Sequence, residues 1–320
     1  MSKTKVAIIG SGPAAHTAAI YTSRAELYPA LFEGFMSGTA GGQLMSTTEV
    51  ENFPGFPNGI TGPELMSGMR AQSQRLGTTI YTEDVTEVKR LNSNLFKVSS
   101  SNRSIEVECV IIATGATAKR LQVPGTRDGE FWQKGVTACA VCDGAMPIFR
   151  DKPLFVIGGG DTAAEEALFL TKYASHVYIV HRRGELRASK IMAKRVLSHS
   201  KITALWNKEL VEVTGSSLVE RVRLKDTLTG ESQEHAASGV FFAIGHTPNT
   251  SFLEGIVQLD ESGYIQPKTT QAADMAKTSE PGIFVAGDVS DKVYRQAITA
   301  AGAGCKAAMD AEHYLQNLHH

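Results

Sequence analysis

The sequence predicts an α/β fold made of two similar domains, one inserted into the other. A pattern of short apolar strand, glycine-rich turn, helix and second strand starts at residue 5 and starts again at residue 153. Two further apolar segments that end in glycine, 110–115 and 240–245, flank the second copy and have the continuous apolar character of buried strands. We therefore expect residues 1–115 and 246–320 to form one discontinuous domain, and residues 116–245 to form the inserted one.

Length and composition fit a globular protein with two cores. The chain has 320 residues, of which 42% are hydrophobic, so each domain has enough apolar side chains for a core. Lysine and arginine (32) nearly balance aspartate and glutamate (33), which leaves no overall field to attract nucleic acid or an anionic membrane. The apolar run Val6–Ile9 is far too short for a signal peptide, and no run approaches the roughly 20 residues that span a bilayer. We expect a cytoplasmic protein with no nucleic-acid or membrane partner.

The first copy of the pattern has the order of elements found in dinucleotide sites. Its strand Lys5–Ile9 leads into the turn Gly10–Ala15, and a helical segment then precedes a second strand, Ala30–Glu33. Glycines in such a turn let the backbone approach a pyrophosphate at the N-terminus of the helix. Glu33 comes roughly 20 residues after the turn, where an acidic residue binds ribose hydroxyls and repels a 2′-phosphate. The first site is therefore predicted to hold FAD or NAD rather than NADP.

The second copy differs at the end of its second strand. The strand Pro153–Ile157 and the turn Gly158–Ala163 repeat the pattern. The strand that follows ends in a basic cluster formed by His181, Arg182, Arg183 and Arg187. Arginine binds phosphate through a planar fork of donors, so this cluster predicts NADPH. An isolated pair of arginines could equally be a solvated turn, but its place in a second copy of the pattern favours the phosphate site.

Cys139 and Cys142 have a spacing that can close a small disulfide or open to a dithiol. Zinc is the main competing interpretation, but it needs four ligands, and no second pair of cysteines or histidines stands at the usual spacing. A chance spacing is the third possibility. The two other cysteines, Cys109 and Cys305, are expected to be ordinary core residues. The nucleotide patterns on either side favour redox chemistry.

Two further stretches predict contacts with a ligand. Residues 41–56 are rich in glycine, proline and polar side chains, which predicts a long loop rather than a strand or helix. The apolar segment that starts at Ile283 ends at Gly287 and Asp288, at the strand edge where ligands of doubly wound sheets gather. Asp288 could equally be a helix cap.

Together these motifs resemble the low-molecular-weight thioredoxin reductases over nearly the whole chain, in the form found in fungi, plants and some protists and bacteria. The sequence departs from the family in the segment Met36–Ala40, which is shorter, and at Met45 and Ser46, where threonines are usual. The matching segments are Gly10–Ala15, Gly41–Leu44, Glu51–Gly55, Ala113–Gly115, Cys139–Gly144, Gly158–Asp161, His181–Arg183, Gly287–Asp288 and Arg295–Ala297.

The resemblance implies two Rossmann-like, three-layer dinucleotide-binding domains, with the NADPH domain inserted into a discontinuous FAD domain. It also implies a homodimer, with thioredoxin as the protein disulfide substrate. The implied FAD contacts are Gly10, Ser11, Gly12, Pro13, Ala14, Ala15, Glu33, Gly42, Gln43, Asn52, Val85, Ala113, Thr114, Gly115, Cys142, Gly287, Asp288, Arg295, Gln296 and Ala297. The implied NADPH contacts are Gly158, Gly160, Asp161, Thr162, His181, Arg182, Arg183, Arg187, Ile244 and Gly245.

The resemblance further implies that electrons pass from NADPH to FAD, then to the cysteine pair, then to thioredoxin. Cys142 is expected nearer the flavin, and Cys139 is expected to engage thioredoxin. Asp143 is the expected general acid and base, which requires a pKa raised by burial, although a helix cap is an alternative. Because NADPH and the cysteines share the inserted domain, that domain is expected to rotate about hinges at 115–117 and 245–248.

Two other functions fit parts of the sequence. A flavin disulfide reductase for another partner, such as a peroxiredoxin or a small disulfide, would carry the same motifs. The peroxidase-reducing flavoproteins have an extra N-terminal disulfide domain, however, and here the first strand starts at residue 5. A catalytically silent nucleotide sensor would be expected to have lost a cysteine, and both are present.

Overall fold

The structure is a computed structural model of the chain that describes residues 4–34, 40–47, 49–253, 255–269 and 276–319. Most of the shortened segment 36–40 lies outside these residues. The chain forms two compact units. The first unit comprises Met1–Thr117 and Thr247–His320, and the second comprises Ala118–His246. Two short strands, β8 (Ala116–Ala118) and β17 (His246–Pro248), pair with each other where the chain leaves and re-enters the first unit.

A five-stranded parallel sheet forms the middle layer of the first unit, in the order β18-β7-β1-β2-β3. Every residue of the central strands β1 and β7 is buried, as expected for continuous apolar runs in a parallel sheet. The strands are β1 (Val6–Ile9), β2 (Ala30–Phe32), β3 (Thr79–Tyr81), β7 (Cys109–Ile112) and β18 (Ile283–Val285).

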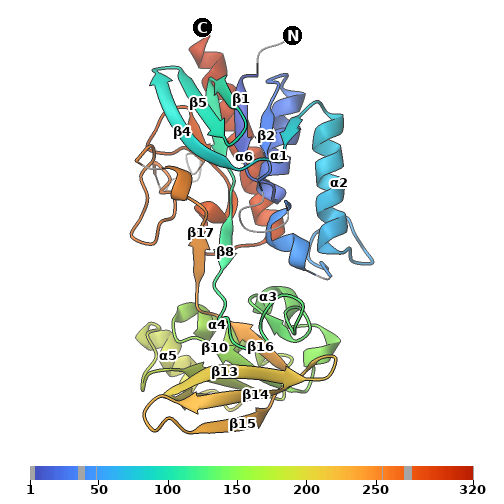
Figure 1. Cartoon of the computed structure of the whole chain (residues 1–320), viewed down its shortest axis with the longest axis vertical. Helices are drawn as coiled ribbons and strands as arrows, with labels where there is room; N and C mark the ends of the chain where they lie inside the picture. The colour runs from blue at the N-terminus through green and yellow to red at the C-terminus, as the bar shows by residue number, and fades with distance from the viewer. Residues whose placement is uncertain (1–3, 35–39, 48, 254, 270–275, 320) are drawn as a thin grey trace. The chain divides into compact units, whose positions relative to one another are not determined.

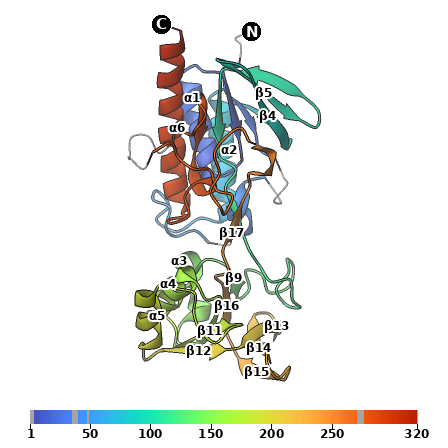
Figure 2. The same ribbon diagram turned by 90° about the vertical axis from the view of Figure 1, so that its left-hand side faces the viewer.

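Different layers cover the two faces of this sheet (Figures 1 and 2). Side chains alternate along a strand, so Val6 and Ile8 pack against helices, whereas Ala7 and Ile9 pack against an antiparallel sheet. The helical layer contains α1 (Pro13–Arg24) and α6 (Ala297–Leu318), and α2 (Gly62–Arg75) packs on α1. The antiparallel layer contains β4 (Val85–Asn92), β5 (Leu95–Ser100) and β6 (Ser104–Val107).

The second unit repeats these three layers. Its parallel sheet has the order β12-β11-β10-β16-β9, with helices packed on one face and an antiparallel sheet on the other. The predicted fold class, two Rossmann-like units of three layers, is confirmed. The parallel strands are β9 (Val136–Thr137), β10 (Pro153–Ile157), β11 (His176–His181), β12 (Ile202–Trp206) and β16 (Gly239–Phe242). The covering elements are α3 (Ala140–Asp143), α4 (Asp161–Leu170), α5 (Lys190–Leu197), β13 (Lys208–Gly215), β14 (Val219–Asp226) and β15 (Ser232–Ala236).

One local prediction was wrong. The segment 41–56 was expected to be a loop throughout, but Gly42–Ser46 forms a short 3₁₀ helix, η1. Gly41 and Gly42 both have positive φ angles, which turn the chain into this helix. The carbonyl of Gln43 then accepts hydrogen bonds from the hydroxyls of Ser46 and Thr47. Further 3₁₀ turns of the described residues lie at Pro147–Phe149 (η2), Ser251–Leu253 (η3) and Gly287–Val289 (η5).

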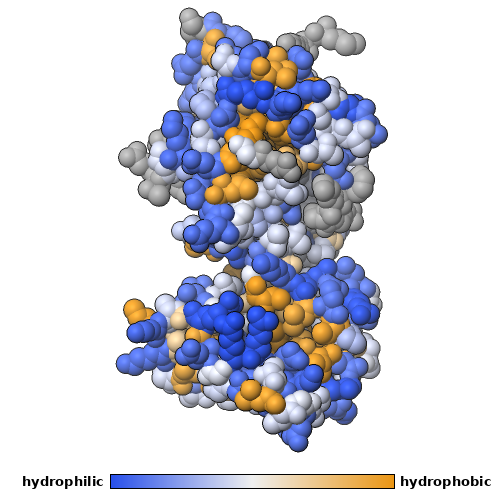
Figure 3. Space-filling model, turned by 60° about the vertical axis from the view of Figure 1, so that its left-hand side comes forward, coloured by the Kyte–Doolittle hydropathy of each residue, from blue (hydrophilic) through white to orange (hydrophobic). Residues whose placement is uncertain are grey.

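Hydrophilic and hydrophobic side chains are interleaved over the face of each unit shown in Figure 3. Within the part of the chain that the structure describes, every helix is too short or too polar to cross a bilayer.

Candidate active site

The first glycine-rich turn brings two strand ends into direct contact. Gly10 follows β1 with a φ of +132°, and a Cβ atom placed on it would lie 2.1 Å from the carbonyl oxygen of Ala113, at the end of β7. Gly12 is the N-cap of α1, and a Cβ there would meet nothing within 4 Å. The turn therefore combines a close backbone crossing with open space at a helix N-terminus. These are the features that a bound pyrophosphate requires.

Glu33, the predicted ribose ligand, is buried at the end of β2 and held by two partners. Its carboxylate accepts hydrogen bonds from Nε and Nη2 of Arg70, at 2.8 and 3.0 Å, and from the hydroxyl of Thr82 at 2.5 Å. Burial alone would raise the pKa of Glu33, but these hydrogen bonds outweigh it and the pKa lies below its usual value. Glu33 and Arg70 line a pocket of about 180 Å³ together with His16, Ala40, Gly41, Met45, Pro63, Met66 and Ser67.

The predicted residues after β18 lie beside the same turn. A Cβ atom on Gly287 would lie 3.1 Å from the Cβ of Ala14. Asp288 is half-buried in the 3₁₀ turn that follows β18, and desolvation, with the nearby charge of Asp291, raises its pKa to about 6 while Arg295 opposes the shift. The strand ends thus bring together residues that are far apart in the sequence, at the carboxyl edge of the sheet.

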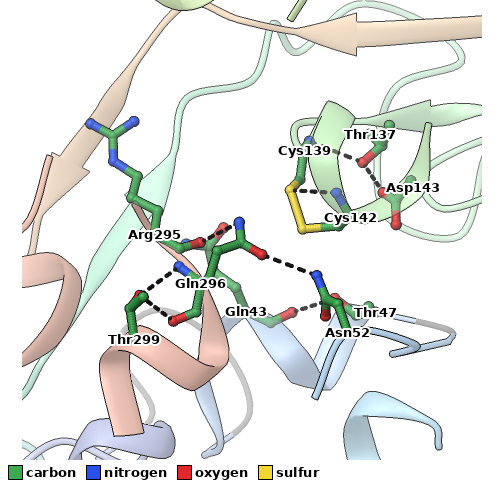
Figure 4. The surroundings of a disulfide bond; sticks show 10 residues. All are labelled: Gln43, Thr47, Asn52, Thr137, Cys139, Cys142, Asp143, Arg295, Gln296 and Thr299. Carbon is green, nitrogen blue, oxygen red and sulfur yellow. Dashed lines mark hydrogen bonds between the residues drawn. A yellow bond between two sulfur atoms is a disulfide. The ribbon is translucent and has the colours of Figure 1, made fainter. Parts of the chain in front are cut away.

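The remaining predicted flavin contacts in the first unit are spread over several elements. Gln43 donates from Nε2 to the carbonyl of Ala116, and Asn52 donates to Oε1 of Gln296 at 3.1 Å (Figure 4). Gln296 is the N-cap of α6. Val85 is buried in the core at the start of β4 and does not line the pocket described above.

The second turn repeats the close crossing of the first. A Cβ atom on Gly158 would lie 2.4 Å from the carbonyl oxygen of Ala243, the counterpart of the contact between Gly10 and Ala113. Gly160 is the N-cap of α4, with nothing within 4 Å of a Cβ placed there. Asp161, the first residue of α4, accepts a hydrogen bond from the backbone N–H of Ser189. The second unit therefore also has an open helix N-terminus beside a tight turn.

The basic cluster lies at the end of β11. His181 is buried there, and burial lowers its pKa, with further lowering from Arg187, Arg183 and Arg182. The three arginines are exposed, and among the described residues no carboxylate forms an ion pair with them. The backbone N–H of Arg187 donates to the carbonyl of Gly159, which ties this cluster to the glycine-rich turn. Unpaired, exposed guanidinium groups beside such a turn fit an incoming phosphate.

Cys139 and Cys142 are joined by a disulfide. Cys139 is the N-cap of the one-turn helix α3, and its Sγ accepts a hydrogen bond from the backbone N–H of Cys142 at 3.2 Å (Figure 4). Among the described residues, no group of three or more His, Cys, Asp and Glu side chains is arranged to hold a metal ion. The two other cysteines are free. Cys109 is buried in β7, and Cys305 is half-buried on α6.

Asp143 is buried beside the disulfide, where Thr137 holds its carboxylate. The hydroxyl of Thr137 donates to Asp143 and accepts a hydrogen bond from the backbone N–H of Cys139 at 3.3 Å (Figure 4). Burial raises the pKa of Asp143, and the hydrogen bond from Thr137 partly opposes that rise. Asp143 is the last residue of α3, whose N-cap is Cys139 and whose C-cap is Gly144, so the alternative that Asp143 is a helix cap was wrong. A protonatable carboxyl group thus lies within one turn of the disulfide.

Comparisons with known proteins decide the family. A family model described as "Pyridine nucleotide-disulphide oxidoreductase" matches residues 4–304. The chain belongs to this family. It is 58% identical to a thioredoxin reductase of Chlamydia pneumoniae, over 98% of this chain and all of that one. It is 57% identical to thioredoxin reductase 2 of Arabidopsis thaliana, over 99% of this chain and 83% of that one.

A solved structure of a thioredoxin reductase from Giardia duodenalis is 41% identical to this chain, with a TM-score of 0.91 and coverage of 99% of this chain and all of that one. The resemblance predicted from the motifs is therefore confirmed, and this member of the pyridine nucleotide-disulphide oxidoreductases is an enzyme.

Membership of the family implies FAD and NADPH as cofactors, and the residues present fit both groups. The two turns leave room for a pyrophosphate at the N-termini of α1 and α4. One turn is followed by a buried carboxylate and the other by exposed arginines, which suits a ribose hydroxyl in the first case and a 2′-phosphate in the second.

Three residues near these sites were missed by sequence reasoning. Arg70 and Thr82 reach Glu33 from elements distant in sequence, and no motif marks either of them. Thr137 lies two residues before Cys139, so its position was visible. Its role was not, because it depends on the turn of α3 that brings Asp143 back to it.

Proposed function

We propose that this protein is an NADPH-dependent thioredoxin-disulfide reductase. One observation supports this proposal most directly: the disulfide of Cys139 and Cys142 lies next to a buried carboxyl group in a chain with two nucleotide cradles. Relatives named thioredoxin reductase match almost the whole length of the chain at 58% and 57% identity.

We assign FAD to the first domain, residues 1–115 and 246–320, and NADPH to the second, residues 116–245. The buried Glu33 supports the first assignment because a carboxylate accepts hydrogen bonds from ribose and repels a 2′-phosphate. The exposed Arg182 and Arg183 support the second because their charge is available to a phosphate.

FAD, when bound, takes the hydride of NADPH and supplies the electron pair that reduces the disulfide. Reduction breaks the bond between the two sulfur atoms and yields two thiols, so two protons are taken up with the two electrons. We assign the delivery of one of these protons to Asp143; burial raises the pKa of its carboxyl group, which lies on the same helical turn as the disulfide, and both observations support this role. Thr137 fixes the direction of that carboxyl group.

Cys139 is the sulfur we assign to thioredoxin. Its Sγ already accepts a hydrogen bond from the N–H of Cys142, a contact that would stabilise a thiolate. The Cys139 thiolate attacks the disulfide of thioredoxin and forms a mixed disulfide, with one thioredoxin sulfur leaving as a thiol. The Cys142 thiolate then attacks Cys139, which releases the second thioredoxin thiol and restores the disulfide.

We further propose that the second domain rotates relative to the first between half-reactions. The linkers contain Gly115 and Gly245, which have φ angles of +66° and +94° and no atoms within 4 Å of a Cβ placed on them. Neither glycine carries a side chain that would oppose rotation of its own backbone. A crosslink between the domains should leave flavin bound and stop turnover; undiminished turnover would contradict the rotation. The homodimer and the cytoplasmic location stay predictions, of which sedimentation tests the first.

The proposed function is tested by NADPH-dependent reduction of purified thioredoxin, followed through the release of free thiols. The wild-type protein and C305S, which removes a cysteine outside the disulfide, should be active with NADPH and nearly inactive with NADH. C139S should bind FAD and reduce no thioredoxin. If NADPH bleaches the flavin of the wild-type protein and no thioredoxin is reduced, the cofactor assignment holds and the proposed partner is wrong.

A further inference from the structure

The guanidinium of Arg70 is paired with a buried carboxylate rather than with solvent. The Glu33 side chain is 3% exposed, whereas that of Arg70 is 42% exposed and lines the same pocket. Nε and Nη2 of Arg70 donate to separate oxygens of Glu33, and Thr82 donates to one of them. A two-pronged contact of this kind fixes the plane of the carboxylate as well as its position.

The helix that carries Arg70 is fastened in place. Thr61 and Glu64 form a capping box at the start of α2. Further along the helix, the hydroxyl of Ser73 donates to the carbonyl of Arg70 and hydrogen-bonds Nδ1 of His16 on α1 at 3.0 Å. Ser73 and His16 are almost fully buried. The contact between α2 and α1 therefore holds Arg70 near the glycine-rich turn that precedes α1.

A carboxylate that receives an arginine fork on one edge keeps lone pairs on the other edge for further donors. The hydroxyls of a ribose are such donors. We infer that Arg70 is a positioning residue for the flavin site, which orients the Glu33 carboxylate toward the ribose hydroxyls of FAD. It acts through Glu33 and not on the isoalloxazine chemistry. The inference rests on the assignment of FAD to the first domain.

A double-mutant cycle on FAD binding by the apoprotein tests the inference, with flavin fluorescence as the readout. R70Q should weaken FAD binding by about tenfold, because it removes charge-assisted hydrogen bonds from the ribose ligand. R75Q makes the same charge change on an exposed residue of the same helix and should bind FAD like the wild type. In an E33Q background, R70Q should add almost nothing, because its effect passes through Glu33.

The pH dependence separates a positioning role from a purely structural one. Glu33 is faced by Arg70 from α2 and by His16 from α1, and Asp84 lies beside the neighbouring Gly34. His16 has a pKa of about 4 because of burial, so it stays neutral in the assay. R70Q removes the strongest of the contacts that lower the pKa of Glu33, so this pKa should rise and the FAD affinity of R70Q should fall further at about pH 5.5 than at about pH 8. R70K retains the charge without the fork and should show the affinity loss with little added pH dependence.

Each outcome decides the inference. Equal FAD binding by R70Q and R75Q overturns it, as does a tenfold loss that is the same in the wild-type and E33Q backgrounds. An affinity loss of R70Q that is equal at both pH values also overturns it, because a general loosening of α2 would not depend on the ionisation of Glu33. If the wild-type apoprotein binds no FAD, the proposed function fails instead.

Discussion

Gly304 on α6 lies against the backbone of α1 at Ala14, and adding one methyl group there should push α6 and α1 apart. A Cβ atom on Gly304 would lie 2.1 Å from the carbonyl oxygen of Ala14 and 3.1 Å from its Cα. Gly302 on the same helix provides a matched control, because a Cβ there would meet nothing within 4 Å. The contact otherwise consists of small side chains, among them Ala300 and Ala307.

The two substitutions should have opposite effects on stability. G302A should stabilise the first unit by about 1 kcal/mol, because alanine favours a helix over glycine. G304A has the same advantage, but a backbone carbonyl cannot move aside as a side chain can, and overpacking of this kind costs about 1–3 kcal/mol. Because both variants share the helix advantage of alanine, they should differ by the overpacking cost alone, about 1–3 kcal/mol in the free energy of unfolding of the first unit.

Two fluorescence signals assign the effect to a unit. Flavin release should report on the first unit, to which we assign FAD, whereas both tryptophans of the chain, Trp132 and Trp206, belong to the second. In urea, G304A should release flavin at a lower concentration than G302A and leave the tryptophan transition unchanged. The reasoning is refuted if the two variants release flavin at the same urea concentration, or if G304A shifts the tryptophan transition instead.

Three further outcomes concern the catalytic groups. T137V removes the hydrogen-bond donor to Asp143 at nearly constant volume, so the rate of thioredoxin reduction should fall by about tenfold. The alkaline limb of its pH–rate profile should also move to higher pH, because the lost hydrogen bond lowers the pKa of Asp143. T137S keeps the hydroxyl and should retain the wild-type rate and the wild-type profile. Burial raises the pKa of Asp143 in the folded protein. The protonated Asp143 side chain therefore contributes to folding stability fully below the unfolded pKa of about 3.9, and this contribution is lost as the pH rises through the folded pKa. D143N should consequently unfold at higher urea than the wild type at about pH 8 while its turnover falls, and a lower midpoint would contradict the burial argument. R183Q should raise the KM for NADPH by about tenfold and leave that for NADH unchanged, whereas equal losses with both nucleotides would show that Arg183 does not read the 2′-phosphate.

The nucleotide turns could be predicted from sequence because their geometry is local. Gly10 and Gly158 each follow an apolar strand, and each has to be glycine because a strand end from elsewhere crosses directly over it. The 3₁₀ helix at Gly42–Ser46 could not be predicted, because its composition favours a loop and its turn depends on hydrogen bonds to one carbonyl. The role of Arg70 could not be predicted for another reason, because only the folded structure brings it opposite Glu33, 37 residues away in the sequence.

The two predicted nucleotide sites have the same backbone arrangement, but their charged side chains differ in whether they are paired with other protein groups before a ligand binds. The charge of the buried Glu33 is already paired with Arg70, and its carboxylate can only accept hydrogen bonds, so this site suits a neutral ligand group that donates them. Arg182 and Arg183 are exposed at the surface, where added salt screens their attraction for a phosphate. A buried, pre-paired site suits a cofactor that stays bound, and an exposed cationic site suits one that exchanges in every turnover. NADPH affinity should accordingly fall steeply as salt is raised while FAD stays bound, and salt-insensitive NADPH binding would contradict this division of roles.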